Sequence, residues 1–96
     1  MANAPSSNKI RVLIVDDIAD MRENIRKLLA FENDIEVVAL AGSGQDGIDC
    51  ARQYQPNIIL MDINMPDMDG ITAAASVIQE VPSAQVIMVS VQSEAD

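Results

Sequence analysis

The stretch "IILMDINMPDMDG", residues 58–70, runs from four apolar residues directly into an acidic loop that contains proline. The apolar run predicts a buried strand over residues 57–62, and Gly70 marks the start of a helix predicted over residues 70–80. A buried strand that ends on a carboxylate, Asp62, is typical of a parallel sheet whose strand ends carry a functional site.

The rest of the chain continues this alternation of strand and helix. Apolar runs predict further strands over residues 10–15, 35–41 and 84–90. Helical spacing of apolar residues predicts further helices over residues 18–31 and 44–54. Strands separated by helices run parallel with right-handed crossovers. The sequence therefore predicts an α/β fold, a doubly wound parallel sheet.

The predicted helices are too few to cover both faces of such a sheet. If the first crossover runs one way along the sheet and the next two run the other way, helix 18–31 lies alone on one face. The fourth strand would then be an uncharged edge, which proteins usually cover. Residues 9–96 would therefore form an incomplete domain that lacks a fifth strand–helix unit. Residues 1–8, which precede the first strand, are expected to be a disordered tail.

Composition narrows the classes of function. The 96 residues fit one small domain, and a hydrophobic fraction of 49% is typical of a globular chain. The net charge of −9 argues against direct contact with nucleic acid or an anionic membrane surface. No apolar run reaches the roughly 18 residues of a membrane span, and no signal-peptide pattern is present. The single cysteine, Cys50, allows no internal disulfide, so we expect a cytoplasmic protein.

Acidic and hydroxyl side chains stand at the ends of three predicted strands. Asp16 and Asp17 end the first strand, Asp62 ends the third, and Ser90 ends the fourth. If the first and third strands are neighbours, three carboxylates crowd together, and a hard cation such as Mg²⁺ would relieve their repulsion. A carboxylate beside Mg²⁺ can attack a phosphoryl group and become an aspartyl phosphate. The simpler interpretation is that the Asp16-Asp17 pair caps the following helix.

In order and spacing, these residues resemble those of the receiver domain of two-component response regulators. The matching residues are Asp16-Asp17, Asp62, the loop "MPDMDG" at 65–70, and Ser90. The resemblance covers residues 9–96 and implies a flavodoxin-like sheet with strand order 2-1-3-4. It implies a domain that takes a phosphoryl group from a histidine kinase or a phosphotransfer protein and then switches an output surface. Such a domain is a phosphoacceptor, not an enzyme, apart from slow self-dephosphorylation.

The resemblance also gives each site residue a role. Asp62 is the phosphoacceptor and also a metal ligand. Asp17 binds Mg²⁺ directly, Asp16 binds it through water, and Asn64 contributes its backbone carbonyl. Ser90 turns toward the phosphoryl group once Asp62 is modified.

The sequence departs from the family pattern in what it lacks. The family has a lysine after a fifth strand, and neither Lys9 nor Lys27 stands at the carboxyl end of a predicted strand. The family also has an aromatic residue on that fifth strand that changes position on switching, and a surface used for signal output. Both are absent here. We therefore expect a piece of a longer receiver, which forms a homodimer or is attached to an output domain.

Four other classes of protein fit parts of the sequence. "GSGQDG", residues 42–47, is a G-x-G-x-x-G after a strand, as in dinucleotide-binding proteins, but Asp46 would lie in the turn that receives the pyrophosphate. A calcium loop that starts at Asp62 would need glycine where Asp67 stands. A phosphatase with an aspartate nucleophile would need a second aspartate where Asn64 stands. The last alternative is a receiver-like interaction or dimerisation module that is not phosphorylated, and the missing lysine favours it.

The remaining charged groups are given structural roles. We expect Asp67 and Asp69 to be loop and helix-cap residues and not ligands. The charged segment "RENIRK", residues 22–27, is predicted to be a solvated helix face.

Overall fold

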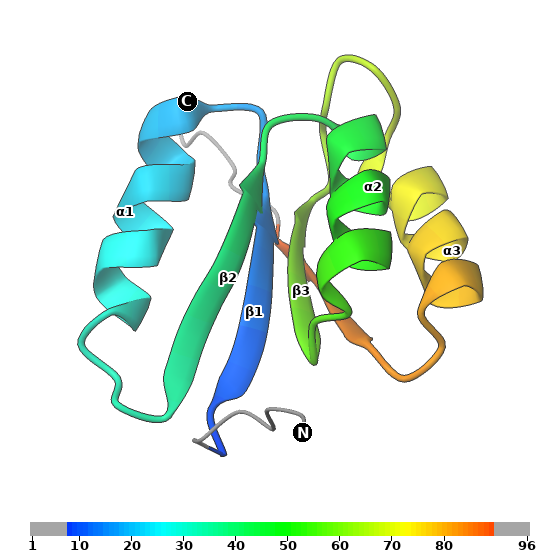
Figure 1. Ribbon diagram of the computed structural model, residues 1–96. Coiled ribbons are helices and arrows are strands. Elements are labelled where there is room, and N and C mark those ends of the chain that lie inside the picture. The colour runs from blue at the N-terminus through cyan, green and yellow to red at the C-terminus, as the bar shows by residue number, and fades with distance from the viewer. Residues whose placement is uncertain (1–7, 90–96) are drawn as a thin grey trace.

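The computed structural model describes residues 8–89, which form a parallel four-stranded sheet with helices on both faces (Figure 1). The elements in chain order are β1 (Ile10–Val15), α1 (Ala19–Leu29), β2 (Ile35–Ala41), α2 (Gly44–Tyr54), β3 (Ile58–Asp62), α3 (Gly70–Glu80) and β4 (Gln85–Val89). The strands lie in the order β2-β1-β3-β4, and every pair is parallel. The predicted α/β class and the strand order 2-1-3-4 are confirmed.

The first helix is shorter than the predicted range of 18–31. Ile18 is its N-cap residue, with extended backbone angles, and the helix ends at Leu29. Beyond that point the N–H of Phe31 bonds to the carbonyl of Leu28, a three-residue spacing that tightens and ends the last turn. The Phe31 side chain is 82% exposed. The helical spacing of apolar residues therefore made the predicted helix too long, because it included Ile18 and Phe31, which are both exposed.

The other predicted bounds differ from the structure only at strand ends. β3 and β4 each begin one residue later than predicted, at Ile58 and Gln85. Residues 1–7 of the predicted tail lie outside the described residues, as does Ser90, the predicted last residue of β4. Each of the three helices has 11 residues, and none in residues 8–89 has the length and hydropathy that crossing a membrane requires.

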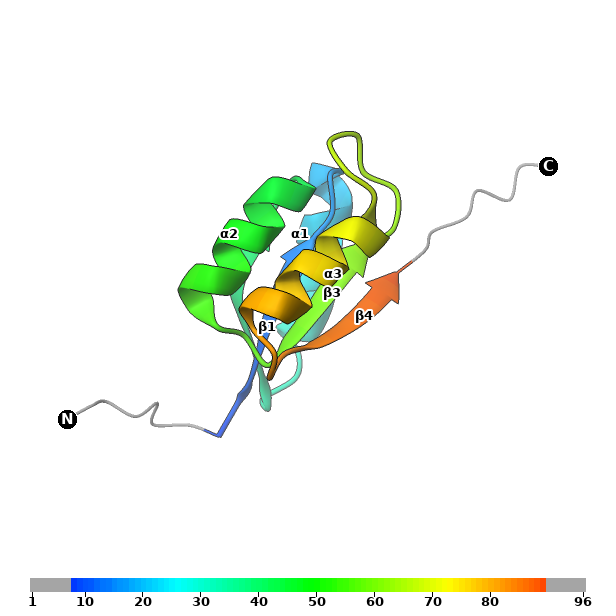
Figure 2. The same cartoon turned by 90° about the vertical axis from the view of Figure 1, so that its right-hand side faces the viewer.

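The main core lies between the sheet and helices α2 and α3, which lie side by side in Figure 2. β1 contributes Leu13 and Val15, and β3 contributes Ile59 and Met61, all of them fully buried. Ala51 of α2 is also fully buried against this layer, so a small side chain allows the helix to pack closely. The packed core holds β1 and β3 side by side at the centre of the sheet.

Within residues 8–89, the opposite face of the sheet is covered by α1 alone (Figure 1). Val12 and Ile14 of β1 are buried on this side, but every residue of α1 stays at least partly exposed. On the edge strand β4, Val86 and Met88 pack against the main core. Because side chains alternate along a strand, Ile87 faces the α1 side, where it is 48% exposed. The predicted shortage of cover on this face is present in the described part of the chain.

Candidate metal site at the strand ends

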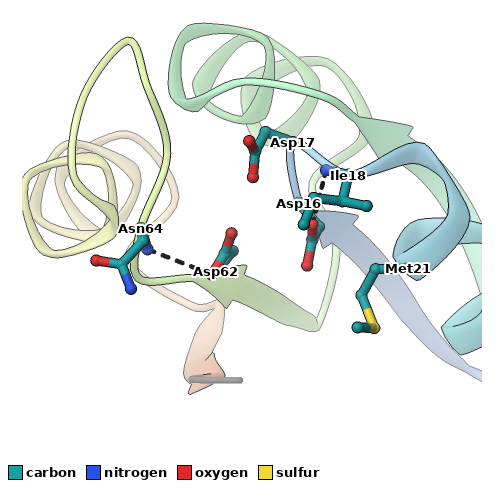
Figure 3. Close-up of a pocket in the computed structure, with 6 residues that line it drawn as sticks. All are labelled: Asp16, Asp17, Ile18, Met21, Asp62 and Asn64. Carbon is teal, nitrogen blue, oxygen red and sulfur yellow. Dashed lines mark hydrogen bonds between the residues drawn. The ribbon is translucent and has the colours of Figure 1, made fainter. Parts of the chain in front are cut away.

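Three carboxylates meet where β1 and β3 end (Figure 3). The two strands pair with Val15 opposite Met61, so the residues that follow in each chain segment lie side by side. Asp16, Asp17 and Asp62 each present an oxygen, and these oxygens lie within 4.8 Å of one another. The structure therefore brings together three of the residues that the sequence placed at strand ends.

Asp16 and Asp17 have different surroundings. Asp16 is only 4% exposed, and its Oδ1 accepts the N–H of Ile18 at 2.8 Å. This bond to the N–H two residues on holds the turn before α1, but the N-cap residue is Ile18 and no side chain of the described residues caps the helix. Asp17 is half-buried and lies on the pocket wall beside Asp62. The interpretation that Asp16 and Asp17 cap α1 is therefore wrong: Asp16 stabilises the turn before the helix, and Asp17 lies on the pocket wall.

The pKa of Asp62 is raised above its ordinary value. The main cause is burial, and repulsion from Asp16 and Asp17 adds to it. The N–H of Asn64, 3.3 Å from Asp62 Oδ1, acts in the opposite direction because it stabilises the charged form. A cation bound between these carboxylates would offset this repulsion and favour the charged form of Asp62.

The residues around this pocket fit a hard cation. Asp16, Asp17 and Asp62 line it together with Ile18, Met21 and Asn64, and its volume is about 220 Å³. A water molecule occupies about 30 Å³ in the liquid, so the pocket has room for an ion that keeps several waters. Among the described residues that line the pocket, the side chains offer carboxylate oxygens as possible metal ligands, together with the amide oxygen and nitrogen of Asn64 and the sulfur of Met21. Carboxylate and carbonyl oxygens with retained waters are the environment that Mg²⁺ prefers.

The loop between β3 and α3 is closed tightly at its base. The N–H of Gly70 donates to the carbonyl of Ile63 at 2.7 Å, and the N–H of Ile63 donates to that of Val89 at 3.2 Å. A Cβ atom on Gly70 would lie 2.1 Å from the backbone oxygen of Asp62, so only glycine fits there. Within the loop, Met65 is buried in the main core. These contacts hold Asp62 and Asn64 at fixed places on the edge of the sheet.

Asp67 and Asp69 both bind the N-termini of helices. Asp69 caps α3, because its Oδ1 accepts the N–H of Thr72 at 2.8 Å. Asp67 reaches across to α2, where its two carboxylate oxygens accept the N–H groups of Gly44 and Gln45 at 2.9 and 3.0 Å. The structure agrees with the expected cap role of Asp69. It also shows that Asp67 occupies the helix N-terminus to which the G-x-G-x-x-G interpretation assigned a pyrophosphate.

Arg22 is another residue whose role sequence reasoning missed. Its guanidinium Nη1 donates to the backbone carbonyl of Asp16 at 2.7 Å, and the side chain is half-buried against Gly42. The prediction that residues 22–27 form a solvated face is therefore wrong for Arg22. No sequence pattern marks it, because its partner is a backbone atom that any residue would offer.

Acidification is expected to weaken the two helix-end contacts. Hydrogen bonds from Gly44 and Gln45 lower the pKa of Asp67, and those from Thr72 lower the pKa of Asp69, both below the ordinary 3.8. A carboxylate with a lowered pKa stabilises the folded state above its unfolded pKa, and this contribution is lost as pH falls through the folded pKa. From about pH 5 to about pH 2, the melting temperature should fall more steeply for the wild type than for a D67N/D69N variant. An equal fall in melting temperature with pH for the two proteins would contradict this prediction.

The model of the response regulator receiver domain family matches residues 12–96, so the chain belongs to this family. It is a receiver domain, a phosphoacceptor module of two-component signalling. Ser90, the predicted phosphoryl contact, lies outside the described residues, and the residue before it, Val89, pairs with Asp62 across β3 and β4.

Curated relatives share this domain and extend well beyond it. The chain is 37% identical over 89 residues to the transcriptional regulatory protein DegU of Brevibacillus brevis, covering 93% of the chain and 38% of that protein. It is 43% identical over 83 residues to a protein-glutamate methylesterase/protein-glutamine glutaminase of Carboxydothermus hydrogenoformans, covering 86% of the chain and 23% of that protein. The chain thus spans well under half the length of either relative.

Solved structures agree with the fold. The response regulator domain of Thermotoga maritima CheB has a TM-score of 0.79 and 39% identity, covering 85% of this chain and 60% of that one. The receiver domain of NarL from Mycobacterium tuberculosis has a TM-score of 0.83 and 30% identity, covering 91% and 70%. The CheX-CheY-BeF3-Mg+2 complex of Borrelia burgdorferi has a TM-score of 0.79 and 29% identity, covering 84% and 61%.

Proposed function

We propose that Asp62 is the phosphoacceptor and that Asp16, Asp17, Asp62 and the Asn64 carbonyl hold Mg²⁺. The observation that carries this proposal is the approach of three carboxylate oxygens to within 4.8 Å at the ends of two paired central strands. Receiver domains typically use Mg²⁺ at an acidic pocket, and the similar CheX-CheY complex of Borrelia burgdorferi is one with BeF3 and Mg²⁺.

Asp62 is better placed than Asp16 to act as the nucleophile. Asp16 is buried, and one of its oxygens is bound to Ile18. Asp62 ends the central strand β3, and its Oδ1 is held by the N–H of Asn64. Its second oxygen is then available to attack phosphorus. The attack forms a new P–O bond, the bond from phosphorus to the donor breaks, and the departing donor atom keeps the electron pair and takes a proton from solvent.

The metal would supply charge compensation, and the protein would supply position. Mg²⁺, when bound, offsets the negative charge of the carboxylates and of the incoming phosphoryl oxygens. Burial of Asp16 and the tight base of the loop fix the oxygens that would hold it. Fixed ligands favour the transfer because they need little rearrangement when the phosphoryl group arrives.

The donor we propose is a histidine kinase or a phosphotransfer protein in the cytoplasm. In the same proposal, Ser90 contacts the phosphoryl group, and the signal passes to an attached output domain or through a homodimer. These assignments rest on membership of the receiver family.

A second candidate is a receiver-like interaction module without phosphoryl chemistry. One observation favours it: among the described residues that line the pocket, none is lysine or arginine. Phosphoryl oxygens are often bound by such cations, so a site without one would hold the phosphoryl group through metal and hydroxyl contacts alone.

Intact-mass analysis separates the two candidates. After incubation with a small phosphodonor and Mg²⁺, the chain should gain the mass of one phosphoryl group, and a chelator should prevent the gain. The variant D17N should incorporate far less, because it removes a ligand that the metal needs. No gain of mass with Mg²⁺ present would support the interaction module instead.

A further inference from the structure

The loop that follows Asp62 is fixed at three places. Its base is closed by the bond between Gly70 and Ile63, and its middle is anchored by the buried side chain of Met65. Its far end is anchored on α2 by Asp67. Asn64 lies between the base and the middle of the loop, so the position of its carbonyl depends on these contacts.

The Asp67 anchor has an ionic part and an apolar part. The two Asp67 carboxylate oxygens accept the first two N–H groups of α2, from Gly44 and Gln45. Met68 packs beside them, because a Cβ on Gly44 would lie 2.3 Å from Met68 Cγ. The N-terminus of an 11-residue helix carries unpaired N–H groups and a partial positive charge, so it stabilises a carboxylate placed there.

From these contacts we propose that Asp67 is a positioning residue for the metal site. It holds the loop against α2, and thereby keeps the Asn64 carbonyl and the Asn64 N–H in place toward the pocket and Asp62. This inference rests on the proposed function, since it assumes that the carboxylate site binds Mg²⁺. Asp67 does not touch the metal and acts only through the loop.

Two observations separate this role from a purely local one. Asp67 is exposed, so its contacts with α2 do little to fill the core. They also join the loop to a helix that begins 23 residues earlier in the chain, and the same loop carries Asn64, whose N–H donates to Asp62. Loss of the anchor should therefore affect the pocket more than the overall stability of the fold.

The test uses the variant D67A with D46A as its matched control. Asp46 lies in the first turn of the same helix, and within the described residues only its backbone N–H takes part in the cap, as donor to Ser43 Oγ. Both variants therefore remove one exposed carboxylate near the same helix end. A third variant, D67N, keeps one oxygen that can accept a hydrogen bond.

Mg²⁺ binding is measured by calorimetric titration of the chain. Removing a residue that orients a metal ligand typically weakens metal binding by 10–100-fold, and we expect D67A to weaken it about tenfold. D46A should stay close to wild type, and D67N should fall between them. In the metal-free protein, hydrogen exchange at Gly44 and Gln45 should be faster in D67A than in D46A.

The outcomes distinguish this inference from the proposed function. If the wild type binds no Mg²⁺, both are overturned. If the wild type binds and D67A binds equally well, only the positioning role is overturned. A lower melting temperature with unchanged Mg²⁺ affinity would also reject it, because that result describes a structural contact alone.

Discussion

Replacing Asp62 with asparagine is expected to abolish phosphoryl incorporation and, in the metal-free protein, to raise the melting temperature. Asparagine offers no anionic oxygen to attack phosphorus, so the labelling is lost. The same change removes one of three carboxylates whose oxygens lie within 4.8 Å of one another, and so relieves their repulsion. We expect a gain of about 1 kcal/mol, or roughly 4–8 °C for a domain of this size.

Mg²⁺ provides the control for this prediction. Added Mg²⁺ should stabilise the wild type more than D62N, because a cation bound to the wild type offsets the repulsion that the variant has already lost. The gap in melting temperature should therefore shrink or reverse. Continued labelling of D62N would move the acceptor to another residue, and an unchanged melting temperature would contradict the repulsion that we assign to the site.

Replacing Gly70 with alanine is expected to destabilise the fold by about 3 kcal/mol or more. The new Cβ would lie 2.1 Å from the backbone oxygen of Asp62 and 2.8 Å from the Cα of Ile63. Both are backbone atoms at the end of β3, and neither can move without disturbing the site. Because small domains have only about 5–15 kcal/mol of stability in total, chemical denaturation will detect the loss readily.

Gly42 offers a matched control for Gly70. The atoms nearest to a Cβ on Gly42 would be those at the end of the Arg22 side chain, 3.0 Å away, which can move aside at the cost of at most its hydrogen bond to the Asp16 carbonyl. G42A should therefore cost much less stability than G70A. Similar losses in the two variants would show that the closed base of the loop does not set the requirement for glycine.

The fold was predictable because its signals are local. The strands at 10–15 and 35–41 and the helices at 44–54 and 70–80 have the predicted bounds, since apolar spacing and capping residues mark them. The predicted range of the first helix was too long because Ile18 and Phe31 continue the helical spacing of apolar residues. A pattern of apolar residues does not reveal that the backbone has already left the helix.

The site was only partly predictable. Asp16, Asp17 and Asp62 could be placed together because parallel strands end at one edge of the sheet. The contacts of Asp67 with Gly44 and of Arg22 with Asp16 could not be foreseen, because each joins a side chain to backbone atoms of another element. Such contacts depend on how the elements dock, and the role of Ser90 stays a prediction.

The pairing of β1 with β3 also makes the site depend on completion of the fold. Asp17 and Asp62 come from segments far apart in the chain, with one strand and two helices between them. Bringing them together requires a long loop to close, and the entropic cost of such non-local pairing slows folding. Partly folded molecules would thus lack the assembled carboxylates, and only chains that have completed their central strand pair would be competent to carry a signal.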